Sequence, residues 1–391
     1  RWIGALPERA GDDHEPVIER WSRVRQLADT AVGMAALPGN RLELLADAER
    51  ILRAIISDIE RAGQFCLLEF YIWNPGGTAD DVAEALMRAA TRGVRCQVLV
   101  DDVGGMDFFR CSWPKRMRDA NVEVRAALPA GVLRTLFRRI DLRLHRKLVV
   151  VDGHVAYTGS LNLVDPRYFK QDAGVGQWVD AMARIEGPAV EALAGLFAWD
   201  WALETGAPLE RLIDEVDVPL DTTAGRASVQ MVPSGPGYEG SAVVQLLLSA
   251  IYGAREELTL TTPYFVPDEP LVAALRSAAQ RGVRVRLIVP AQVDSFLVRY
   301  ASRAFFADLL EAGVEILLFD GGLLHTKSVV VDRELAFFGT LNLDIRSFLL
   351  NFEVTLIVYD PGFARDLAAL QMHYASASES LELADWEQRP G

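Results

Sequence analysis

Short apolar runs alternate with helical patterns of roughly ten to fifteen residues along most of this chain. Residues 148–151 and 329–331 are unbroken runs of Leu and Val, which is typical of strands buried on both faces of a sheet. Strands that alternate with amphipathic helices in this way predict an α/β fold, in which helices cover both faces of the sheet.

The same order of elements occurs twice. Residues 67–100 match residues 258–289, and the last strand pattern of each begins with Gly-Val-Arg, at Gly93 and Gly282. Residues 120–124 match 312–316 in the same way. Each half therefore reads helix, strand, helix, strand, helix, strand, and then one further strand with its partner. A repeat this long indicates duplication of a whole domain rather than a solenoid.

The predicted organisation has five parts. Between the two α/β domains, Gly, Pro, Asp and Thr replace the periodic pattern, which is typical of a linker. After the second domain, a helical pattern leads into a polar, acidic tail. The expected boundaries are an N-terminal helical segment at 1–40, a first domain at 41–204, the linker at 205–227, a second domain at 228–362, and the C-terminal helix and tail at 363–391.

A phrase with His and Lys interrupts the apolar pattern once in each half. Both copies read H-x-K-x4-D-x6-G-[ST]-L-N, although the chain holds only five histidines. A lone copy would be a common structural coincidence, whereas two copies at one spacing indicate function. The two sets of polar residues are His145, Lys147, Asp152, Ser160 and Asn162, and His325, Lys327, Asp332, Thr340 and Asn342.

The spacing separates the roles of these residues. Side chains two apart on a strand share a face, so each His projects together with its Lys. Each Asp, at opposite parity and past the strand end, is expected to anchor the following turn rather than to touch substrate. A His, a fixed cation and neutral hydrogen-bond donors suit a phosphoryl group. Because no carboxylate cluster suited to Mg²⁺ accompanies either copy, we expect no metal and no cofactor.

Two copies predict one site that both halves share. One histidine would attack phosphorus and form a phosphohistidine. The other would protonate the leaving oxygen and then deprotonate the acceptor.

The double motif resembles the phospholipase D superfamily at every signature position. Longer strings, at 157–178, 262–267, 301–306 and 321–328, resemble the bacterial cardiolipin synthases of the long, membrane-anchored type. This similarity runs from about residue 42 to the C-terminal helix. It implies two tandem phospholipase D-like α/β sandwich domains, one active site at their interface, a phosphohistidine intermediate and no metal.

The resemblance also implies roles for residues. His145 would be the nucleophile and His325 the general acid/base. The family's acidic residue, eleven positions after the motif Asn, orients a catalytic His; Glu353 has this spacing, whereas the first half has Ala173 there. Aligning the end of the next strand pairs Asp180 with Glu353 instead, at the cost of an insertion. The residues implied to surround the phosphate oxygens are Lys147, Lys327, Asn162, Asn342, Ser160 and Thr340.

The reaction implied is the condensation of two phosphatidylglycerol molecules to cardiolipin and glycerol. The family's location implies the bacterial inner membrane, with the catalytic part on its cytoplasmic side. Because synthases of the long type carry N-terminal transmembrane helices, the resemblance implies that such helices precede Arg1 in the native protein, and a start without Met agrees with this expectation.

A net charge of −14 argues against a nucleic-acid partner and requires segregated charge for an enzyme that meets an anionic membrane. Residues 131–143 mix arginines with large apolar side chains, which suits a helix lying at headgroup depth. An ordinary amphipathic helix packed on the domain is the alternative. The candidate membrane contacts are Arg134, Phe137, Arg138 and Arg139, and residues 295–300 are a second candidate segment.

Other functions remain open at this point. A hydrolytic phospholipase D would share the chemistry up to the phosphohistidine and use water as acceptor. A phosphatidylserine synthase-like transferase would use serine. A non-catalytic lipid-binding protein would keep the fold without turnover, although both copies of the motif are intact. The sequence does not indicate an oligomeric state.

Overall fold

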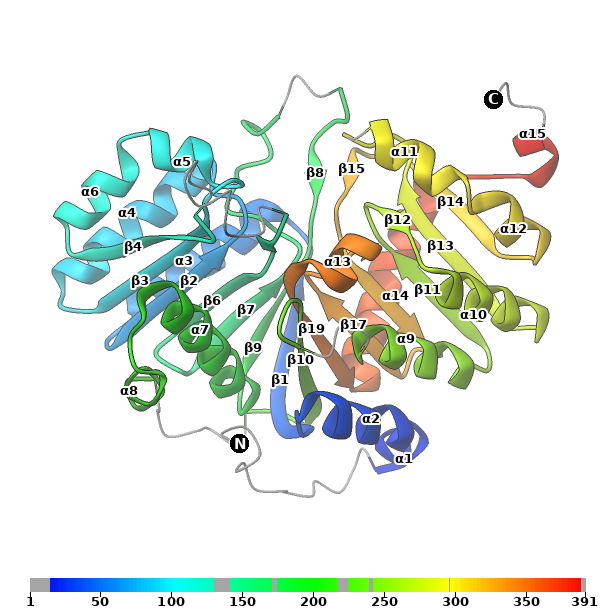
Figure 1. The fold of residues 1–391 in the computed structure, drawn as a ribbon, viewed down its shortest axis with the longest axis horizontal. Coiled ribbons are helices and arrows are strands. Elements are labelled where there is room, and N and C mark those ends of the chain that lie inside the picture. Colours follow the sequence, from blue (N-terminus) through cyan, green and yellow to red (C-terminus); the bar gives the residue numbers. More distant parts are fainter. Residues whose placement is uncertain are drawn as a thin grey trace.

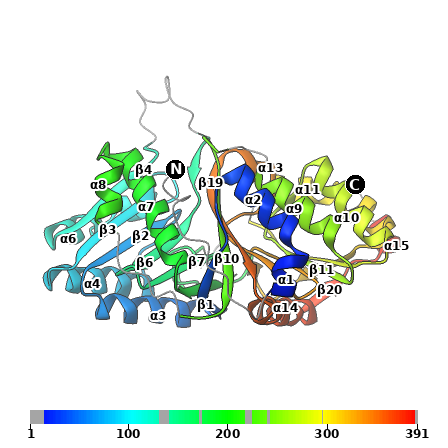
Figure 2. The ribbon, with the colours of Figure 1, turned by 90° about the horizontal axis from the view of Figure 1, so that it is seen from below.

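The computed structural model describes residues 15–129, 141–170, 174–216, 224–238, 242–294 and 296–387. These residues form a mixed sheet of 16 strands with helices on both faces (Figure 1). The α/β fold expected from the alternating pattern is confirmed. Seen from below, α7 and α9 lie on one side of the sheet, and α3 and α14 lie on the other (Figure 2).

The first half extends from β1 to α7. Its strands β6 and β2 are buried along their whole length, as the apolar runs predict. Its elements are β1 (Leu37–Leu45), α3 (Ala48–Arg61), β2 (Phe65–Phe70), α4 (Thr78–Thr91), β3 (Arg95–Asp101), α5 (Met106–Arg110), α6 (Trp113–Asp119), β4 (Val122–Ala127), β5 (Arg143–Leu144), β6 (Lys147–Val151), β7 (Val155–Gly159), β8 (Trp178–Val179), β9 (Met182–Glu186) and α7 (Ala189–Thr205).

The second half repeats this order. Its elements are β10 (Ala227–Ser234), α9 (Ala242–Gly253), β11 (Glu257–Thr261), β12 (Phe265–Val266), α10 (Glu269–Gln280), β13 (Arg284–Pro290), α11 (Phe296–Arg303), α12 (Phe306–Glu311), β14 (Glu315–Phe319), β15 (Leu323–Leu324), β16 (Ser328–Val331), β17 (Leu335–Gly339), β18 (Leu343–Asp344), α13 (Ile345–Leu349), β19 (Asn351–Tyr359) and α14 (Pro361–Ser376). Two short elements follow it, β20 (Ser378–Ser380) and α15 (Leu383–Glu387).

The two halves are joined edge to edge in one sheet. The strand order is β20-β14-β13-β11-β16-β17-β19-β10-β1-β9-β7-β6-β2-β3-β4, so β10 and β1 meet at the centre. Helix α7 of the first half contacts β10, and α14 of the second half contacts β1. One hydrophobic cluster accordingly includes Phe197 of α7 and Leu356 of β19. The seam is thus a continuous core, which fixes the two motifs relative to each other.

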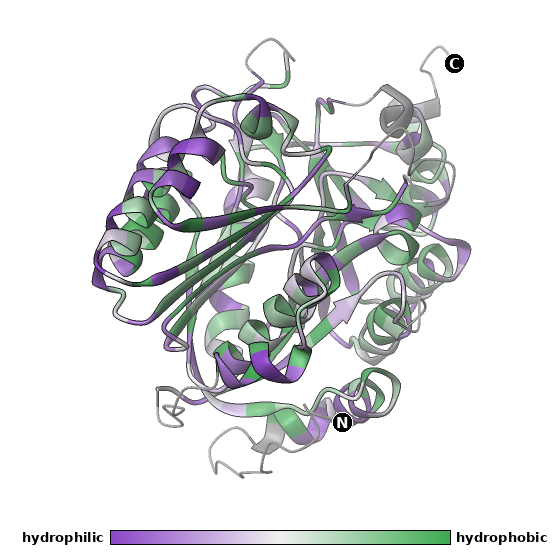
Figure 3. Cartoon of the chain, turned by 60° about the vertical axis from the view of Figure 1, so that its left-hand side comes forward, coloured by the Kyte–Doolittle hydropathy of each residue, from purple (hydrophilic) through white to green (hydrophobic). Residues whose placement is uncertain are grey.

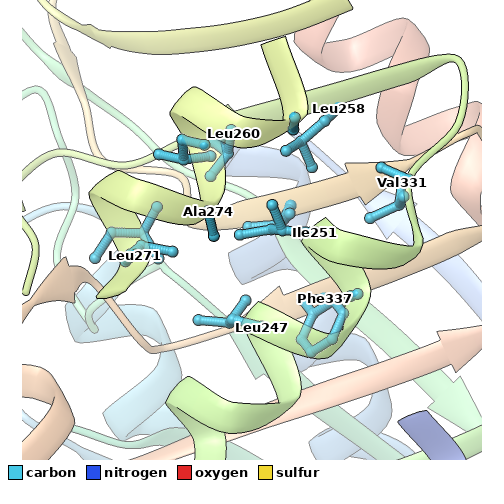
Figure 4. Packing of buried hydrophobic residues seen from close by; sticks show 14 of the residues in the cluster. Leu247, Ile251, Leu258, Leu260, Leu271, Ala274, Val331 and Phe337 are labelled. Atoms are coloured by element: carbon cyan, nitrogen blue, oxygen red, sulfur yellow. The ribbon is translucent and has the colours of Figure 1, made fainter. Parts of the chain in front are cut away.

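Local sequence explains where the helices begin. Asp47 caps α3 by accepting the amide of Arg50 at 2.7 Å, and Asp360 caps α14 by accepting the amide of Phe363 at 2.6 Å. In the second half, apolar side chains of α9 and α10 converge on β11, β16 and β17 (Figure 4). Hydrophobic residues, in green, are frequent along the strands, whereas the helices carry both hydrophobic and hydrophilic residues (Figure 3).

The structure differs from the sequence expectations near the seam. The N-terminal segment contains the helices α1 (Glu15–Arg20) and α2 (Ser22–Val32), but β1 already starts at Leu37, before the expected boundary at 41. The pairing of this strand with β10 is irregular between Leu37 and Asn40, where Pro38 and Gly39 stand. The expected linker contains a helix, α8 (Leu209–Asp214), whose Leu212 is buried in the core.

Candidate active site

Each histidine lies on a segment that hydrogen-bonds to the opposite half. Strand β5, just before His145, pairs in parallel with β19 of the second half, and the His145 amide donates to the Phe352 carbonyl at 2.9 Å. Strand β15, just before His325, pairs in parallel with β8 of the first half (Figure 1). The His325 amide donates to the Val179 carbonyl at 2.8 Å. The crossed pairing brings both motifs to the seam.

Each imidazole also meets a carboxylate from the opposite half. His145 Nδ1 lies 2.8 Å from Glu353 Oε1, and His325 Nδ1 lies 2.7 Å from Asp180 Oδ1. All four side chains are buried. The sequence pointed to both acids, and the structure places each against the histidine of the other half. A hydrogen bond from Nδ1 fixes the orientation of the ring and directs Nε2 toward a ligand.

Each lysine makes the same hydrogen bond, to the backbone carbonyl of its own histidine. Lys147 Nζ donates to the His145 carbonyl at 2.6 Å, and Lys327 Nζ donates to the His325 carbonyl at 2.6 Å. Both side chains are buried, as the shared strand face predicts for Lys and His. Each lysine nitrogen therefore lies next to its own histidine in a buried part of the site.

The hydroxyls of the Gly-[Ser/Thr]-Leu-Asn segments support the carboxylate strands. Ser160 Oγ donates to Asp180 Oδ1 at 2.6 Å, while Thr340 Oγ1 accepts the amide of Val354 at 2.9 Å. The side-chain Oδ1 of Asn162 accepts the amide of Ile72 at 3.2 Å. The side-chain Oδ1 of Asn342 is buried and accepts no hydrogen bond from the described residues.

Both motif aspartates lie at the far end of the strand from the histidines. Asp152 accepts the amides of residues 63–65 at 2.7 to 2.8 Å, and Asp332 accepts those of residues 255–257 at 2.8 to 3.0 Å. Both have a positive φ, 52° and 50°. Each carboxylate therefore ties the hairpin turn to the start of β2 or β11, and neither touches a histidine.

Burial controls the charges in this site. It lowers the pKa of His145 and of His325 to about 4, against the opposing charges of Glu353 and Asp180. Burial also lowers the pKa of Lys147 to about 8 and that of Lys327 to about 7; for Lys327 the charge of Lys147 adds to the effect. The four groups influence one another across the seam, so they share one electrostatic environment.

The pKa values of the two carboxylates are shifted toward the charged form, unlike those of the histidines and lysines. Burial alone would raise the pKa of Asp180, but the charge and hydrogen bond of His325 and the charge of Lys327 hold it below its ordinary value. His145 and Lys147 lower the pKa of Glu353 in the same way. Both acids are therefore ionised at neutral pH and favour an Nδ1–H on the facing imidazole.

Sequence reasoning missed several groups around the histidines. The ring of Tyr71 lies 5.0 Å from that of His145, and the ring of Trp178 lies 4.3 Å from that of His325. Arg146, between His145 and Lys147, is fully buried and pairs with Asp200 of α7. A signal for Trp178 existed, since it stands two residues before Asp180 and so shares its strand face. Arg146 carried no such signal.

In the described part of the chain, no three His, Cys, Asp or Glu side chains are grouped so that they could hold a metal ion. No helix in that part combines the length and the apolar character needed to cross a bilayer. The candidate membrane contacts Arg134, Phe137, Arg138 and Arg139 lie outside the described residues.

Comparison with known proteins decides the family. The model described as "Cardiolipin synthase, PLD-like domain" matches residues 55–201 and 247–372, so each motif lies in one matched segment. The chain belongs to the cardiolipin synthase family. It is 48% identical over 391 residues to cardiolipin synthase A of Serratia proteamaculans (strain 568), covering all of this chain and 80% of the relative. Cardiolipin synthase A of Edwardsiella ictaluri is 50% identical over 368 residues, covering 93% of this chain and 75% of the relative.

Solved structures support the fold. Phosphatidylserine synthase of Haemophilus influenzae Rd KW20 superposes with a TM-score of 0.68 at 15% identity, covering 93% of both chains. Polyphosphate kinase of Porphyromonas gingivalis gives a TM-score of 0.57 at 14% identity, covering 97% of this chain and 52% of the other. The architecture of two phospholipase D-like halves expected from the sequence is confirmed, and the enzyme is a cardiolipin synthase by family.

Proposed function

We propose that this chain condenses two phosphatidylglycerol molecules to cardiolipin and glycerol through a phosphohistidine at His145. The observation that carries the proposal is the crossed arrangement of two buried His–carboxylate pairs beside two lysines. Membership of the cardiolipin synthase family supports the same reaction.

His145 acts as the nucleophile. The hydrogen bond from Nδ1 to Glu353 leaves the lone pair on Nε2, and the lowered pKa of His145 keeps the ring neutral at pH 7. Nε2 attacks phosphorus of the first phosphatidylglycerol, and the P–O bond to the glycerol headgroup breaks. The leaving oxygen takes a proton from His325, so that free glycerol departs.

His325 is protonated when substrate binds. Burial and the charge of Lys327 lower its pKa in the empty site, and an anionic phosphate between the lysines opposes both effects. After glycerol leaves, neutral His325 removes the proton from a headgroup hydroxyl of the second phosphatidylglycerol. That oxygen attacks phosphorus and the P–N bond breaks, which returns neutral His145 and releases cardiolipin.

The remaining motif residues hold the phosphate and the scaffold. Lys147 and Lys327 neutralise the non-bridging oxygens, with Asn162 and Asn342 as neutral partners and Ser160 and Thr340 beside them. Asp152 and Asp332 keep the motif strands in register. We place the enzyme at the bacterial inner membrane, with the site on the cytoplasmic side and Arg134, Phe137, Arg138 and Arg139 toward anionic lipid.

A product analysis tests the proposal. Purified protein is incubated with phosphatidylglycerol vesicles, and lipids and glycerol are quantified. We expect one cardiolipin and one glycerol per two phosphatidylglycerol consumed, and no product with His145→Ala. Phosphatidic acid with glycerol would mean hydrolysis, phosphatidylserine after addition of serine would mean a different acceptor, and lipid binding without product would mean a non-catalytic protein. Each of these three results would overturn the proposal.

A further inference from the structure

Large apolar side chains are exposed on both segments that follow the motif asparagines. In the first half, Tyr168 lies six residues after Asn162 and is 62% exposed. In the second half, β18 leads directly into α13, where Ile345 and Leu349 are 47% and 52% exposed. These two residues are four apart and therefore share one side of the helix, while Phe348 is buried and anchors it. Related positions in the two halves thus both present apolar surface.

Printed contacts connect these segments to a third one. Strand β18 pairs with β12, and α11 packs against β12, so α11 and α13 rest on the same small sheet. Tyr300 of α11 is 54% exposed. Lys170 of the first-half segment pairs with Asp294, just before α11, at 3.2 Å. In Figure 1, α11 and α13 lie near β15, the strand that leads into His325. We call Tyr168, Tyr300, Ile345 and Leu349 the mouth surface.

Charges on these segments are sorted by depth. The acidic side chains turn inward, since buried Asp165 accepts the amide of Thr78 at 3.0 Å and Asp344 caps α13 through the amide of Ser347 at 2.7 Å. The cations lie outside: Arg167 and Lys170 have exposed side chains, and so does Arg346, which donates to the Asp141 carbonyl at 2.8 Å. An anionic group that approaches from outside therefore meets the cations first.

We propose that the mouth surface docks on an anionic phospholipid bilayer. Its four apolar side chains enter the interfacial layer, and Arg167, Lys170 and Arg346 meet the lipid phosphates. The docking rests on the proposed function only in taking a membrane lipid as substrate. The two histidines are only 7% and 2% exposed, and α13 follows closely on the motif segment that ends at Asn342. Docking here lets a headgroup enter while its acyl chains stay in the bilayer.

A bilayer fits these features better than a second protein. The apolar side chains stand on three separate segments instead of forming one continuous face, and the exposed cations Arg167, Lys170 and Arg346 lie on two of these segments. Helix α13 also continues directly from the motif segment that ends at Asn342 through β18. Insertion of Ile345 and Leu349 into the bilayer surface therefore fixes the position of the second motif relative to the lipid headgroups.

Vesicle flotation with matched variants tests the docking. We compare the double variant Ile345→Ser/Leu349→Ser and the single variant Tyr300→Ser with Tyr252→Ser. Tyr252 is 53% exposed and precedes β11, at the end of the sheet where Asp332 lies, away from the histidines. With phosphatidylglycerol vesicles, we expect roughly tenfold weaker binding for the double variant, a smaller loss for Tyr300→Ser and none for Tyr252→Ser. Circular dichroism checks that each variant is folded.

A second measurement does not depend on loss of binding. An environment-sensitive fluorophore on Ile345→Cys should shift to shorter wavelength when phosphatidylglycerol vesicles are added, whereas Tyr252→Cys should show no shift. Cys111 is partly exposed and can also take up the fluorophore. The parent chain, treated in the same way, therefore measures the background signal from Cys111.

The outcomes separate docking from catalysis. Parent-like vesicle binding by the folded double variant would overturn the docking, even if cardiolipin is made. Vesicle binding that depends on Ile345 and Leu349 without cardiolipin formation would overturn the proposed function and leave the docking standing. A lipid-free dimer of the parent that the double variant loses would assign the surface to a second copy of the chain, and so would also overturn the docking.

Discussion

The residue between His and Lys differs completely in the two halves. In the first half it is Arg146, which pairs with Asp200 of α7 and donates from Nε to the Glu353 carbonyl at 3.1 Å. In the second half it is Thr326, whose hydroxyl lies 3.1 Å from the Tyr374 hydroxyl of α14 and 3.3 Å from the Val179 carbonyl. Both side chains are fully buried. One half uses a buried ion pair where the other uses neutral hydroxyls.

The two solutions perform the same task. Arg146 holds the backbone of Glu353, and Thr326 holds the backbone next to Asp180, so each ties its motif strand to the opposite half's carboxylate segment. Glu69 lies beside this ion pair, where burial and the charge of Asp200 raise the pKa of Glu69 well above its ordinary value and favour its neutral form. Duplication preserved the strand geometry, whereas the layer between strand and covering helix diverged. The difference teaches that the first motif depends on a buried ion pair and the second on neutral hydrogen bonds.

The largest expected effect separates the two histidines. His145→Ala and His325→Ala should each lower phosphatidylglycerol turnover by about 10⁴-fold. A phosphatidyl ester of p-nitrophenol needs no proton for its leaving group, so His325→Ala should recover adduct formation on it and His145→Ala should not. Intact-protein mass spectrometry measures the adduct.

The exposed residue His373 supplies the control, because His373→Ala should react like the parent chain. Rescue of His145→Ala instead of His325→Ala would reverse the assignment of nucleophile and acid.

The next effect tests the crossed pairing of the carboxylates. Glu353→Gln and Asp180→Asn should each lower kcat by about 10² to 10⁴-fold, because an amide no longer favours Nδ1–H on the facing ring. Glu353 serves His145, so Glu353→Gln should stay slow on the p-nitrophenyl ester. Asp180 serves His325, so Asp180→Asn should recover on that ester. The opposite pattern would show that each acid acts within its own half.

The sequence predicted more of the strands than of their pairing. The duplicated unit, the buried motif strands and both acids followed from periodicity, spacing and resemblance. The crossing did not, because two equivalent halves leave own-half and opposite-half partners equally consistent with one spacing. Glu353 has the family's spacing of eleven positions after the motif Asn, whereas Asp180 matches Glu353 only if an insertion in the first half is assumed. The structure places both against histidines at nearly the same distance.

Other features were hidden for physical reasons. Pro38 and Gly39 interrupt β1, yet the buried Asn40 side chain holds the strand at the seam by donating to the Leu37 carbonyl at 2.6 Å and accepting the amide of Ala189 at 2.7 Å. A polar side chain with such long-range partners looks like a turn residue in the sequence. The sequence likewise carried no sign that Arg146 is buried, because its partner Asp200 lies on a helix 54 residues away.

Stability should show the same contrast between the buried ion pair and the neutral hydrogen bonds. Arg146→Met leaves Asp200 as an unpaired buried charge and should lower the free energy of unfolding by about 3 to 5 kcal/mol. Thr326→Val removes neutral hydrogen bonds and should cost about 1 kcal/mol. Urea denaturation of the two variants measures both. Removing both charges in Arg146→Met/Asp200→Leu should restore part of the loss, and equal costs for the two single variants would remove the contrast.

The smallest effect distinguishes the lysines by pH. The pKa of Lys327 is lowered to about 7 and that of Lys147 to about 8, so the cationic forms that attract phosphate prevail below these values. Affinity for glycerophosphoglycerol, a diester whose own charge is constant from pH 5 to 9, should be highest below about pH 7 and fall by up to about tenfold per pH unit above it. Isothermal titration calorimetry from pH 6 to 9 measures this. Lys327→Arg keeps its charge, so its affinity should start to fall only near pH 8, where Lys147 deprotonates. In Lys147→Arg, the affinity should still fall near pH 7, where Lys327 deprotonates. Identical pH profiles of affinity for the two variants would show that Lys147 and Lys327 do not differ in pKa.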